Sequence, residues 1–228
     1  MSSRVVAITG AFGVLGRAVA KAAGEAGWAR VWIDFAPAPA GLPAGPDDLV
    51  LGGVDLADPE AAAAAFGAVV ARFGRLDVLF NIAGGFAWME LAQSTPADWE
   101  RLFRMNTVTC SNACRAARAA LVASGSGRIV NVGALGAQSA SAGMGPYAAS
   151  KAGVHKLTES LAQELKGQVT VNAVLPSIID TPQNRADMPD ADPAKWVAPE
   201  ELATVMLFLG SEAASGVNGA LLPVSGRV

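Results

Sequence analysis

Short apolar segments alternate with helical segments along this chain. The apolar segments are rich in β-branched residues, and their length predicts buried strands. They cover residues 4–9, 30–34, 49–52, 76–81, 128–132, 169–175 and 220–224. Helical patterns occupy residues 14–27, 59–73, 99–121, 147–165 and 198–209. Strands that alternate with helices are typical of a doubly wound parallel α/β sheet, here a seven-stranded Rossmann fold with helices on both faces.

Two stretches interrupt this alternation. Residues 36–48 are rich in Pro, Ala and Gly, so the helix expected after the second strand is reduced to a loop. Residues 177–196 carry prolines and acids and are expected to form an irregular loop. We interpret residues 177–197 as a short substrate lid. Because the chain has neither repeats nor a linker, one domain is expected over residues 1–228.

The composition narrows the class of protein. The chain has 228 residues, of which 52% are hydrophobic and 16% charged, which predicts a large core and an apolar subunit contact. A net charge of −3 without a basic run argues against a nucleic-acid partner. No apolar run is long enough for a membrane span, and Met1 leads almost directly into the first strand, so we expect no secretory signal and a cytoplasmic protein.

The chain has few residues of the types that bind metals. It contains two cysteines, Cys110 and Cys114, four residues apart on a predicted helix. Its single histidine, His155, lies elsewhere in the sequence and is interpreted as a packed or hydrogen-bonded side chain at a subunit contact. No metal site is therefore expected, and the cysteines are interpreted as reduced apolar side chains.

A glycine-rich turn connects the first strand to the first helix. Its glycines, Gly10, Gly13 and Gly16, let the backbone approach a pyrophosphate, and the helix N-terminus offers free N–H groups. The second strand ends in Asp34, where a dinucleotide fold places a carboxylate on the adenosine ribose. Because a carboxylate repels a 2′-phosphate, the sequence predicts NAD(H) rather than NADP(H). Taken alone, Asp34 is equally consistent with a cap at the strand end.

Tyr147 and Lys151 are four residues apart at the start of a predicted helix, so they share one face. Tyr147 is the only tyrosine in the chain. A neighbouring ammonium favours the phenolate and is expected to lower the phenol pKa toward neutral pH, which suits a general acid or base. In isolation the pair is also consistent with a half-buried aromatic ring beside a solvated lysine.

Several motifs together resemble the short-chain dehydrogenase/reductase family over nearly the whole chain. Each motif lies on the element where the family has it, and they follow one another in the family's order. They are Thr9-Gly10-x5-Gly16, Asp34, Asp55, Asn81-x-Ala83-Gly84, Asn106, Tyr147-x-x-x-Lys151 and Pro176-x-x-Ile179-x-Thr181.

The resemblance implies hydride transfer linked to a nicotinamide cofactor. Tyr147 would donate the proton, Lys151 would hold the nicotinamide ribose, and Asn106 would anchor a water relay. Ile179 and Thr181 would hold the carboxamide and phosphate side of the cofactor. The implied cofactor-binding set is Gly10, Phe12, Gly13, Val14, Leu15, Gly16, Asp34, Asp55, Leu56, Asn81, Ala83, Gly84, Tyr147, Lys151, Pro176, Ile179 and Thr181.

The sequence departs from the common family pattern in the glycine turn, near the active site and at the C-terminus. Val14 stands where the family usually has its middle glycine, and Ala134 replaces the serine thirteen residues before the tyrosine. The C-terminal segment, residues 223–228, is short and carries a basic residue just before its final valine. The sequence also resembles the dihydropteridine reductase branch of the family. The resemblance lies in the glycine spacing, in Trp196 and in the segments 83–88, 132–134, 143–144 and 175–192. That branch prefers NADH and also lacks the serine.

The missing serine bears on the substrate. A carbonyl reductase gains from two hydrogen-bond donors on the developing oxyanion, and losing one costs about a hundredfold or more in rate. Either the substrate needs one donor, as an imine or quinonoid ring would, or Ser139 or Ser141 substitutes; solvated loop serines are the preferred interpretation of these two. Trp88 and Trp196, together with Phe86, either stack a flat substrate or pack the loops together.

The function expected from the sequence is an NAD(H)-dependent reductase of a C=N or C=O bond in a small molecule, such as a quinonoid dihydropterin. An ordinary carbonyl or 3-oxoacyl reductase is the alternative among enzymes, and a non-catalytic NAD-binding sensor is the alternative outside them. The helices at residues 106–121 and 147–165 carry many small residues, including Ala116, Ala117, Ala119 and Ala120. In this family such helices pair across a two-fold axis, which predicts a dimer or tetramer.

Overall fold

The computed structural model describes residues 4–228. Residues 1–3, where no secretory signal is expected, lie outside the described part. Seven parallel strands form one sheet in the order β3-β2-β1-β4-β5-β6-β7. They are β1 (Val5–Thr9), β2 (Ala29–Ile33), β3 (Leu49–Leu51), β4 (Val78–Asn81), β5 (Gly127–Val132), β6 (Val169–Pro176) and β7 (Leu221–Val224). The predicted doubly wound, seven-stranded fold is confirmed.

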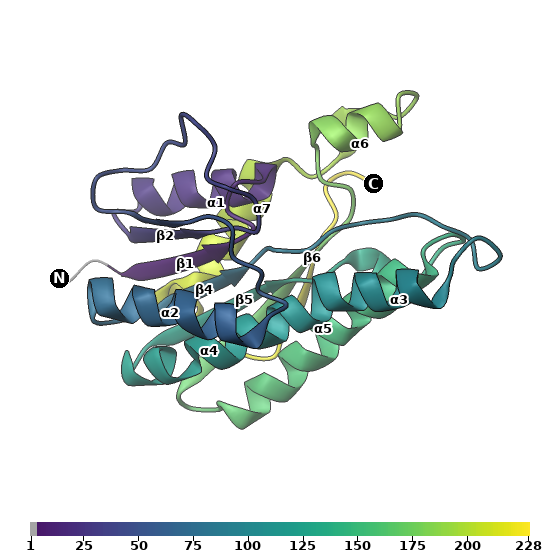
Figure 1. Ribbon diagram of the computed structural model, residues 1–228. Coiled ribbons are helices and arrows are strands. Elements are labelled where there is room, and N and C mark those ends of the chain that lie inside the picture. Colours follow the sequence, from purple (N-terminus) through teal and green to yellow (C-terminus); the bar gives the residue numbers. More distant parts are fainter. Residues whose placement is uncertain (1–3) are drawn as a thin grey trace.

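Helices cover both faces of this sheet (Figure 1). One layer contains α1 (Val14–Glu25) and α7 (Pro199–Gly210), which pack against each other. The opposite layer contains α2 (Pro59–Phe73), α4 (Thr109–Ala123) and α5 (Gly145–Glu164). This arrangement places the carboxyl ends of all strands at one edge of the sheet, where open α/β folds bind ligands.

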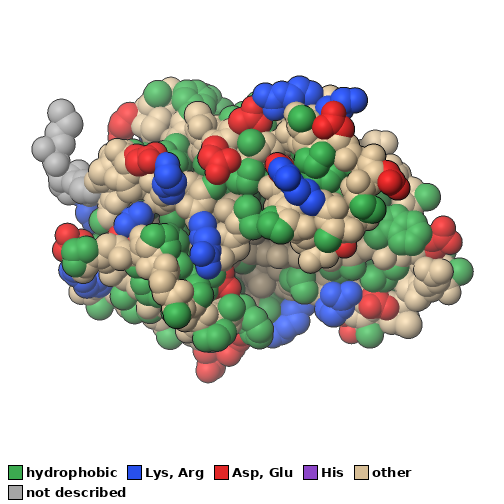
Figure 2. Space-filling view, turned by 90° about the horizontal axis from the view of Figure 1, so that it is seen from above, with side chains coloured by type: hydrophobic (Ala, Val, Ile, Leu, Met, Phe, Trp, Pro, Cys, Tyr) green, Lys and Arg blue, Asp and Glu red, His purple; other side chains and the backbone are tan. Residues whose placement is uncertain are grey.

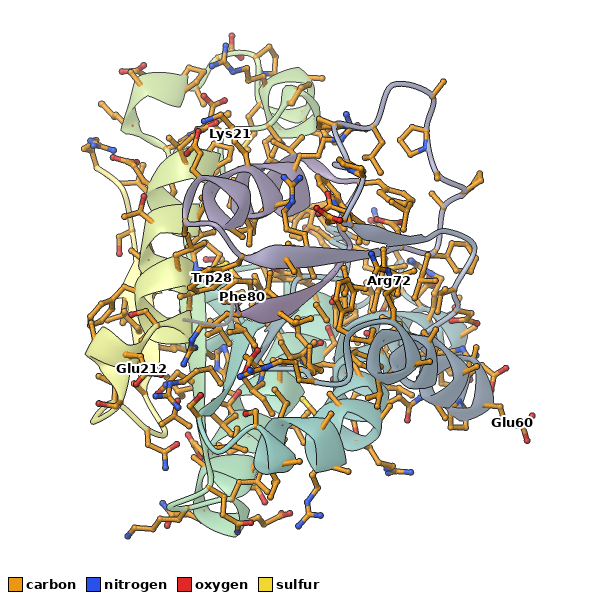
Figure 3. The ribbon with its side chains drawn as sticks, turned by 90° about the vertical axis from the view of Figure 1, so that its left-hand side faces the viewer. Lys21, Trp28, Glu60, Arg72, Phe80 and Glu212 are labelled. Carbon is orange, nitrogen blue, oxygen red and sulfur yellow. The ribbon has the colours of Figure 1, made fainter. Side chains whose placement is uncertain are left out.

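The alternation of side chains along β1 divides the core into two parts. Val5 and Ala7 pack toward α2, α4 and α5, whereas Val6 and Ile8 pack toward α1 and α7. A strand buried on both faces therefore reads as a continuous apolar run. At the base of the α1–α7 layer, Trp28 lies beside Phe80, with ring centroids 6.4 Å apart (Figure 3).

The segment predicted as one long helix is interrupted near its middle. It consists of α3 (Pro96–Phe103), a π-helical turn η1 (Arg104–Val108) and α4. The π-turn inserts a wider turn around Asn106 without breaking the helical rod. Single π-turns inside helices often occur at functional sites, and no simple sequence period announces them.

The lid segment is more ordered than the sequence predicted. It contains the short helix α6 (Pro182–Asp187) and the 3₁₀ turn η3 (Pro193–Lys195). Thr181 begins α6, and its side chain accepts a hydrogen bond from the Asn184 amide, while Pro182 occupies the first helical position. The expectation of a wholly irregular loop is wrong because this capping sequence supports a turn of helix. Residues 36–48 form the expected loop without a helix.

Candidate active site

A cleft of about 1080 Å³ opens along the carboxyl ends of the strands. It lies where β1 and β4 are neighbours, so the chain crosses from one half of the sheet to the other there. Of the predicted cofactor residues, the following line it: Gly10, Phe12, Gly13, Val14, Leu15, Gly16, Asp34, Asp55, Leu56, Ala83, Gly84, Ile179 and Thr181.

The β1–α1 turn leaves the N-terminus of α1 open to the cleft. Gly13 precedes the helix without a capping side chain, and the first turn of α1 contains no acidic residue among the described residues. The free N–H groups and the positive dipole end fit a pyrophosphate. Val14 is the first helical residue and is 42% exposed, so the side chain in place of the family glycine lies on the cleft wall rather than inside the turn.

Asp34 follows β2 and faces this turn. One carboxylate oxygen accepts a hydrogen bond from the Phe12 amide at 2.9 Å, and the other accepts one from the Ala36 amide at 2.9 Å. These bonds fix the carboxylate at the cleft wall, where its negative charge opposes a 2′-phosphate. Its geometry therefore fits both the ribose-binding and the capping interpretations.

Thr9 connects the glycine turn to the next strand, a contact that the sequence analysis did not single out. Its hydroxyl accepts hydrogen bonds from the amides of Ile82 and Ala83 at 3.0 and 3.1 Å. Asn81, expected in the cofactor site, has a buried side chain whose Nδ2 donates to Asn131 Oδ1 at 2.9 Å. The Asn81 amide group thus lies below the cleft and contacts the strand next to it.

Asn106 lies in the π-turn and joins three elements. Its Oδ1 accepts from the Gly85 amide at 2.9 Å, and its Nδ2 donates to the Gly85 carbonyl at 3.0 Å and to Ser150 Oγ at 2.9 Å. Ser150 Oγ in turn donates to the Tyr147 carbonyl at 2.7 Å. Because both Nδ2 hydrogens of Asn106 are used in this clamp, a water relay at this residue would have to use its backbone or the remaining lone pair of Oδ1.

Lys151 points toward the end of β5. Its Nζ donates to the Val132 carbonyl at 2.7 Å, and only 6% of the residue is exposed. A Cβ atom on Gly84 would lie 3.3 Å from this Nζ and 2.5 Å from Asn106 Oδ1, so the missing side chain at Gly84 leaves room for both polar groups. Burial lowers the pKa of Lys151 to about 8.

Tyr147 has a pKa opposite to the one predicted. Burial raises the pKa of Tyr147 to about 12, and the expected lowering by Lys151 is wrong for this structure. The physical reason is that burial disfavours the charged phenolate, while the Lys151 ammonium donates to Val132. The phenol is therefore protonated at neutral pH and suited to act as an acid. The edge of its ring meets Phe86, with centroids 4.8 Å apart.

The position of the missing serine is a closed apolar wall. Ala134 follows β5 and is 4% exposed. Ser139 and Ser141 are exposed on the next loop. Their exposure agrees with the preferred interpretation of solvated serines, and it leaves the Tyr147 phenol as the donor provided by α5.

The aromatic residues expected at the rim have different environments. Trp88 is 55% exposed, and its indole N–H donates to the Ala142 carbonyl at 3.1 Å. Phe86 is also 55% exposed. Trp196 is 3% exposed, which favours the second of the two expected roles, packing of the loops, over stacking on a substrate. The tail residue Gly226 lies against the Trp196 carbonyl.

Two arginines on the far wall of the cleft were missed by the sequence analysis. Arg101 and Arg104 belong to α3 and the π-turn and face the glycine turn across the cleft. Arg104 forms an ion pair with Asp55 over 3.3 Å. The two arginines are three residues apart, and the second lies two residues before Asn106. This spacing places them on one face of a helix and could have identified them from the sequence.

The cysteines lie below the site. Cys110 and Cys114 are buried and unpaired, and the Cys110 thiol donates to Asn131 Oδ1 at 3.3 Å. Burial and the neighbouring thiol raise the pKa of Cys114. Within residues 4–228, no group of three His, Cys, Asp or Glu side chains is arranged to hold a metal ion.

The surface above the cleft carries basic and acidic side chains in alternation rather than a patch of one sign (Figure 2).

Within residues 4–228, every helix is too short or too polar to cross a membrane.

A glycine turn and an open helix N-terminus at the switch point of a Rossmann sheet, with a Tyr–Lys pair on α5 whose lysine reaches the end of β5, define a nucleotide-dependent oxidoreductase of this fold. A family model described as short chain dehydrogenase matches residues 4–192. The chain therefore belongs to the short-chain dehydrogenase family.

Known relatives support this assignment over nearly the full length. The 3-oxoacyl-[acyl-carrier-protein] reductase FabG of Vibrio cholerae is 31% identical, over 99% of this chain and 97% of the relative. The cis-4-hydroxycyclohexanecarboxylate dehydrogenase of Sinomonas cyclohexanicum is 35% identical, over 99% and 96%. These relatives are reductases and dehydrogenases of C=O and C–OH groups by name, so the finer resemblance to dihydropteridine reductase stays a prediction.

Solved structures of other dehydrogenases agree with this family assignment. The aldohexose dehydrogenase of Thermoplasma acidophilum superposes with a TM-score of 0.89 at 25% identity, covering 99% of this chain and 93% of that one. The carveol dehydrogenase of Mycobacterium avium, solved with NAD, gives 0.86 at 26% identity, covering 99% and 97%.

Proposed function

We propose that this protein is an NAD(H)-dependent reductase of a C=N or C=O bond in a small cyclic molecule, of the quinonoid dihydropterin type. A single domain over residues 1–228 would carry the reaction, with residues 177–197 as the lid. The observation that carries the proposal is the pairing of a protonated phenol at Tyr147 with an apolar wall at Ala134.

The cofactor would supply the hydride, and the protein's own residues would supply the proton and the orientation. Tyr147, with its pKa raised to about 12, holds its proton at neutral pH and donates it to the atom that gains electron density. Lys151 and Asn106 contact the backbone on both sides of the site, at Val132 and Gly85, and keep Tyr147 and the cleft in register.

The single donor favours an acceptor that needs only one hydrogen-bond donor. A ketone develops an oxyanion that two donors stabilise better than one, whereas a C=N nitrogen or a quinonoid ring takes a proton directly from the phenol. The exposed ring of Phe86, which meets the Tyr147 ring, and the exposed ring of Trp88 provide flat apolar surface for such a substrate. These contacts support a heteroaromatic substrate.

Asp34 supports NADH over NADPH. Its carboxylate lies at the cleft wall beside the glycine turn and has two backbone partners that hold it there. A 2′-phosphate would meet this charge, while ribose hydroxyls would donate to it. NAD is the nucleotide in the carveol dehydrogenase complex, a protein of the same fold.

An ordinary carbonyl or 3-oxoacyl reductase is the second candidate. The names of the relatives favour it, including the acetoacetyl-CoA reductase of Cupriavidus necator, which is 30% identical over 99% of this chain. A non-catalytic NAD sensor is the third, and the retained Tyr147 and Lys151 argue against it.

Steady-state NADH oxidation on a substrate panel tests the proposal. The panel contains a quinonoid dihydropterin, a cyclic imine, a cyclic ketone and acetoacetyl-CoA, with the variant Tyr147→Phe as the matched control. We expect the pterin or imine to give the highest kcat/KM, and Tyr147→Phe to lose it while NADH binding stays intact. Preference for acetoacetyl-CoA would establish the second candidate, and NADH binding without turnover on any substrate would establish the sensor.

A further inference from the structure

Two consecutive peptide groups at the end of β5 are held by three different partners. The Val132 carbonyl accepts from Lys151 Nζ at 2.7 Å, and the Gly133 amide donates to the Val174 carbonyl at 2.9 Å. The Ala134 amide donates to Nε2 of His155 at 3.3 Å. Lys151 and His155 are one helical turn apart on α5, so a single helix face holds this stretch of backbone at the end of β5.

Gly133 makes room for the imidazole. A Cβ atom on this residue would lie 2.5 Å from His155 Nε2 and 2.7 Å from Cδ2. Any side chain at this position would therefore push the ring away from the Ala134 amide. The chain thus combines a small residue and a histidine so that the ring can reach the backbone, and His155 itself is 4% exposed.

The direction of this hydrogen bond sets the protonation state of the ring. An imidazole nitrogen accepts a hydrogen bond only through its lone pair, so Nε2 must be unprotonated and the proton must reside on Nδ1. Doubly protonated His155 would have no acceptor for the Ala134 amide. The buried amide would then face a second N–H donor and lose its partner.

We propose that His155 is a positioning residue that works only as a neutral imidazole, holding the Ala134 wall of the active site in place and releasing it on protonation. Turnover would then fall at acid pH through movement of the Gly133–Ala134 backbone, while Tyr147 itself stays protonated. The kinetic part of this inference rests on the proposed function; the state of the ring does not.

The charges around the ring act in the required direction. Burial lowers the pKa of His155 from its usual 6.5, and Lys151 on the preceding turn lowers it further. Lys156 lowers the pKa as well, and Glu159 raises it. The side of the ring that carries Nε2 lies against Gly133, near Leu175, and neither of these residues carries a charge. The contribution of neutral His155 to the stability of the folded protein is therefore complete above pH 6.5. It is lost as the pH falls through the pKa of His155 in the folded protein, which lies below 6.5.

The chain offers a direct test because His155 is its only histidine. In tag-free protein, nitrogen-15 NMR of the imidazole reads this residue without any substitution. We expect the Nδ1–H tautomer at pH 7 and a titration midpoint below 6.5. A ring protonated on Nε2 at pH 7, or a midpoint at or above 6.5, would overturn the inference regardless of activity or substrate.

Two variants give the kinetic test on the best substrate of the panel. His155→Gln keeps an acceptor oxygen but does not titrate, so it should retain kcat and lose the acid limb of the pH profile. His155→Leu removes the acceptor and should lower kcat at every pH by about a hundredfold, the scale of a misplaced active-site group. Cofactor affinity should change little in either.

Lys156→Gln is the matched control, since this exposed lysine lies next to the histidine and is paired with Glu159 at 2.7 Å. It should keep kcat and shift the acid limb slightly toward higher pH. An unchanged acid limb in His155→Gln, or wild-type kcat in His155→Leu, would refute the positioning role. If no substrate turns over in any form of the protein, the proposed function fails and the NMR result alone decides the state of His155.

Discussion

Lys151 donates a hydrogen bond from its Nζ to the carbonyl oxygen of Val132 over 2.7 Å, so its charge is directed at the backbone of β5. The phenol pKa in the free protein is set by burial of the Tyr147 ring, with no lowering by this lysine. Burial lowers the pKa of Lys151 to about 8 and raises that of Tyr147 to about 12. Both groups are thus shifted toward their neutral forms, which favours proton donation over proton abstraction until a cofactor adds charge to the site.

The first prediction concerns the titration of Tyr147, which can be followed by phenolate absorbance because the chain has one tyrosine. In the free protein the midpoint should lie above 10, near 12. NAD⁺ should lower it, because a positive nicotinamide ring favours the phenolate, and NADH should not. Substrate oxidation, which needs the phenolate, should therefore accelerate as the pH rises, while reduction should not.

The variant Lys151→Met separates two influences on the Tyr147 pKa, burial of the ring and the charge of the lysine. The Tyr147 midpoint of the free protein should change little, since burial rather than the lysine sets it, while NADH binding should weaken. A free-protein midpoint below 10 that rises in Lys151→Met would contradict this account and restore the lysine as the dominant influence.

The second prediction concerns Asp34. Asp34→Ala should reduce the preference for NADH over NADPH in kcat/KM by roughly tenfold or more, because a charge-assisted hydrogen bond contributes about 1.5–3 kcal/mol and its loss also removes a repulsion. Asp48→Ala is a control, since that carboxylate pairs with Arg30 outside the cleft. If the cofactor ratio stays unchanged in Asp34→Ala, the carboxylate serves only to cap the Phe12 and Ala36 amides.

The third prediction concerns assembly. Phe103, the last residue of α3, is 48% exposed and lies beside Gly153 of α5, one of the two helices expected to pair across a two-fold axis. Light scattering at micromolar concentration should show a dimer or tetramer, and Phe103→Asp should lower the mass. Val70→Asp, at a 43% exposed valine on α2, should leave it unchanged. A monomeric wild-type protein would refute the prediction.

Within the helices expected to pair, the small residues play different parts. Ala117 is buried in the core of its own chain, whereas Ala119 is exposed and Ala116 and Ala120 are partly so. Only the latter three can contribute to a subunit contact.

The sequence predicted the parts of this protein that depend on local patterns. Apolar runs located all seven strands, and the glycine turn with Asp34 located the cleft. Features that depend on packing were not predictable: the π-turn at Asn106, the burial of Trp196 and the direction of the Lys151 ammonium each follow from neighbours distant in sequence. The Tyr147 pKa was wrong for the same reason, since desolvation of the ring and of its lysine is a property of the fold.

The last prediction concerns Ala134, which stands where most of the family has a serine. A hydroxyl at this position, where the family has its serine, would add a second donor for a developing oxyanion. Ala134→Ser should therefore raise kcat/KM for a cyclic ketone, by up to about a hundredfold, and leave NADH binding unchanged. Reduction of a cyclic imine should gain little, because its nitrogen takes the phenol proton and carries no oxyanion. Ala137→Ser, one turn further along on the 3₁₀ segment Leu135–Ala137, is the matched control and should change neither rate. An equal gain on ketone and imine would mean that the serine acts by general polarity or by shifting the backbone held by His155, and the single-donor explanation for the substrate would have to be abandoned.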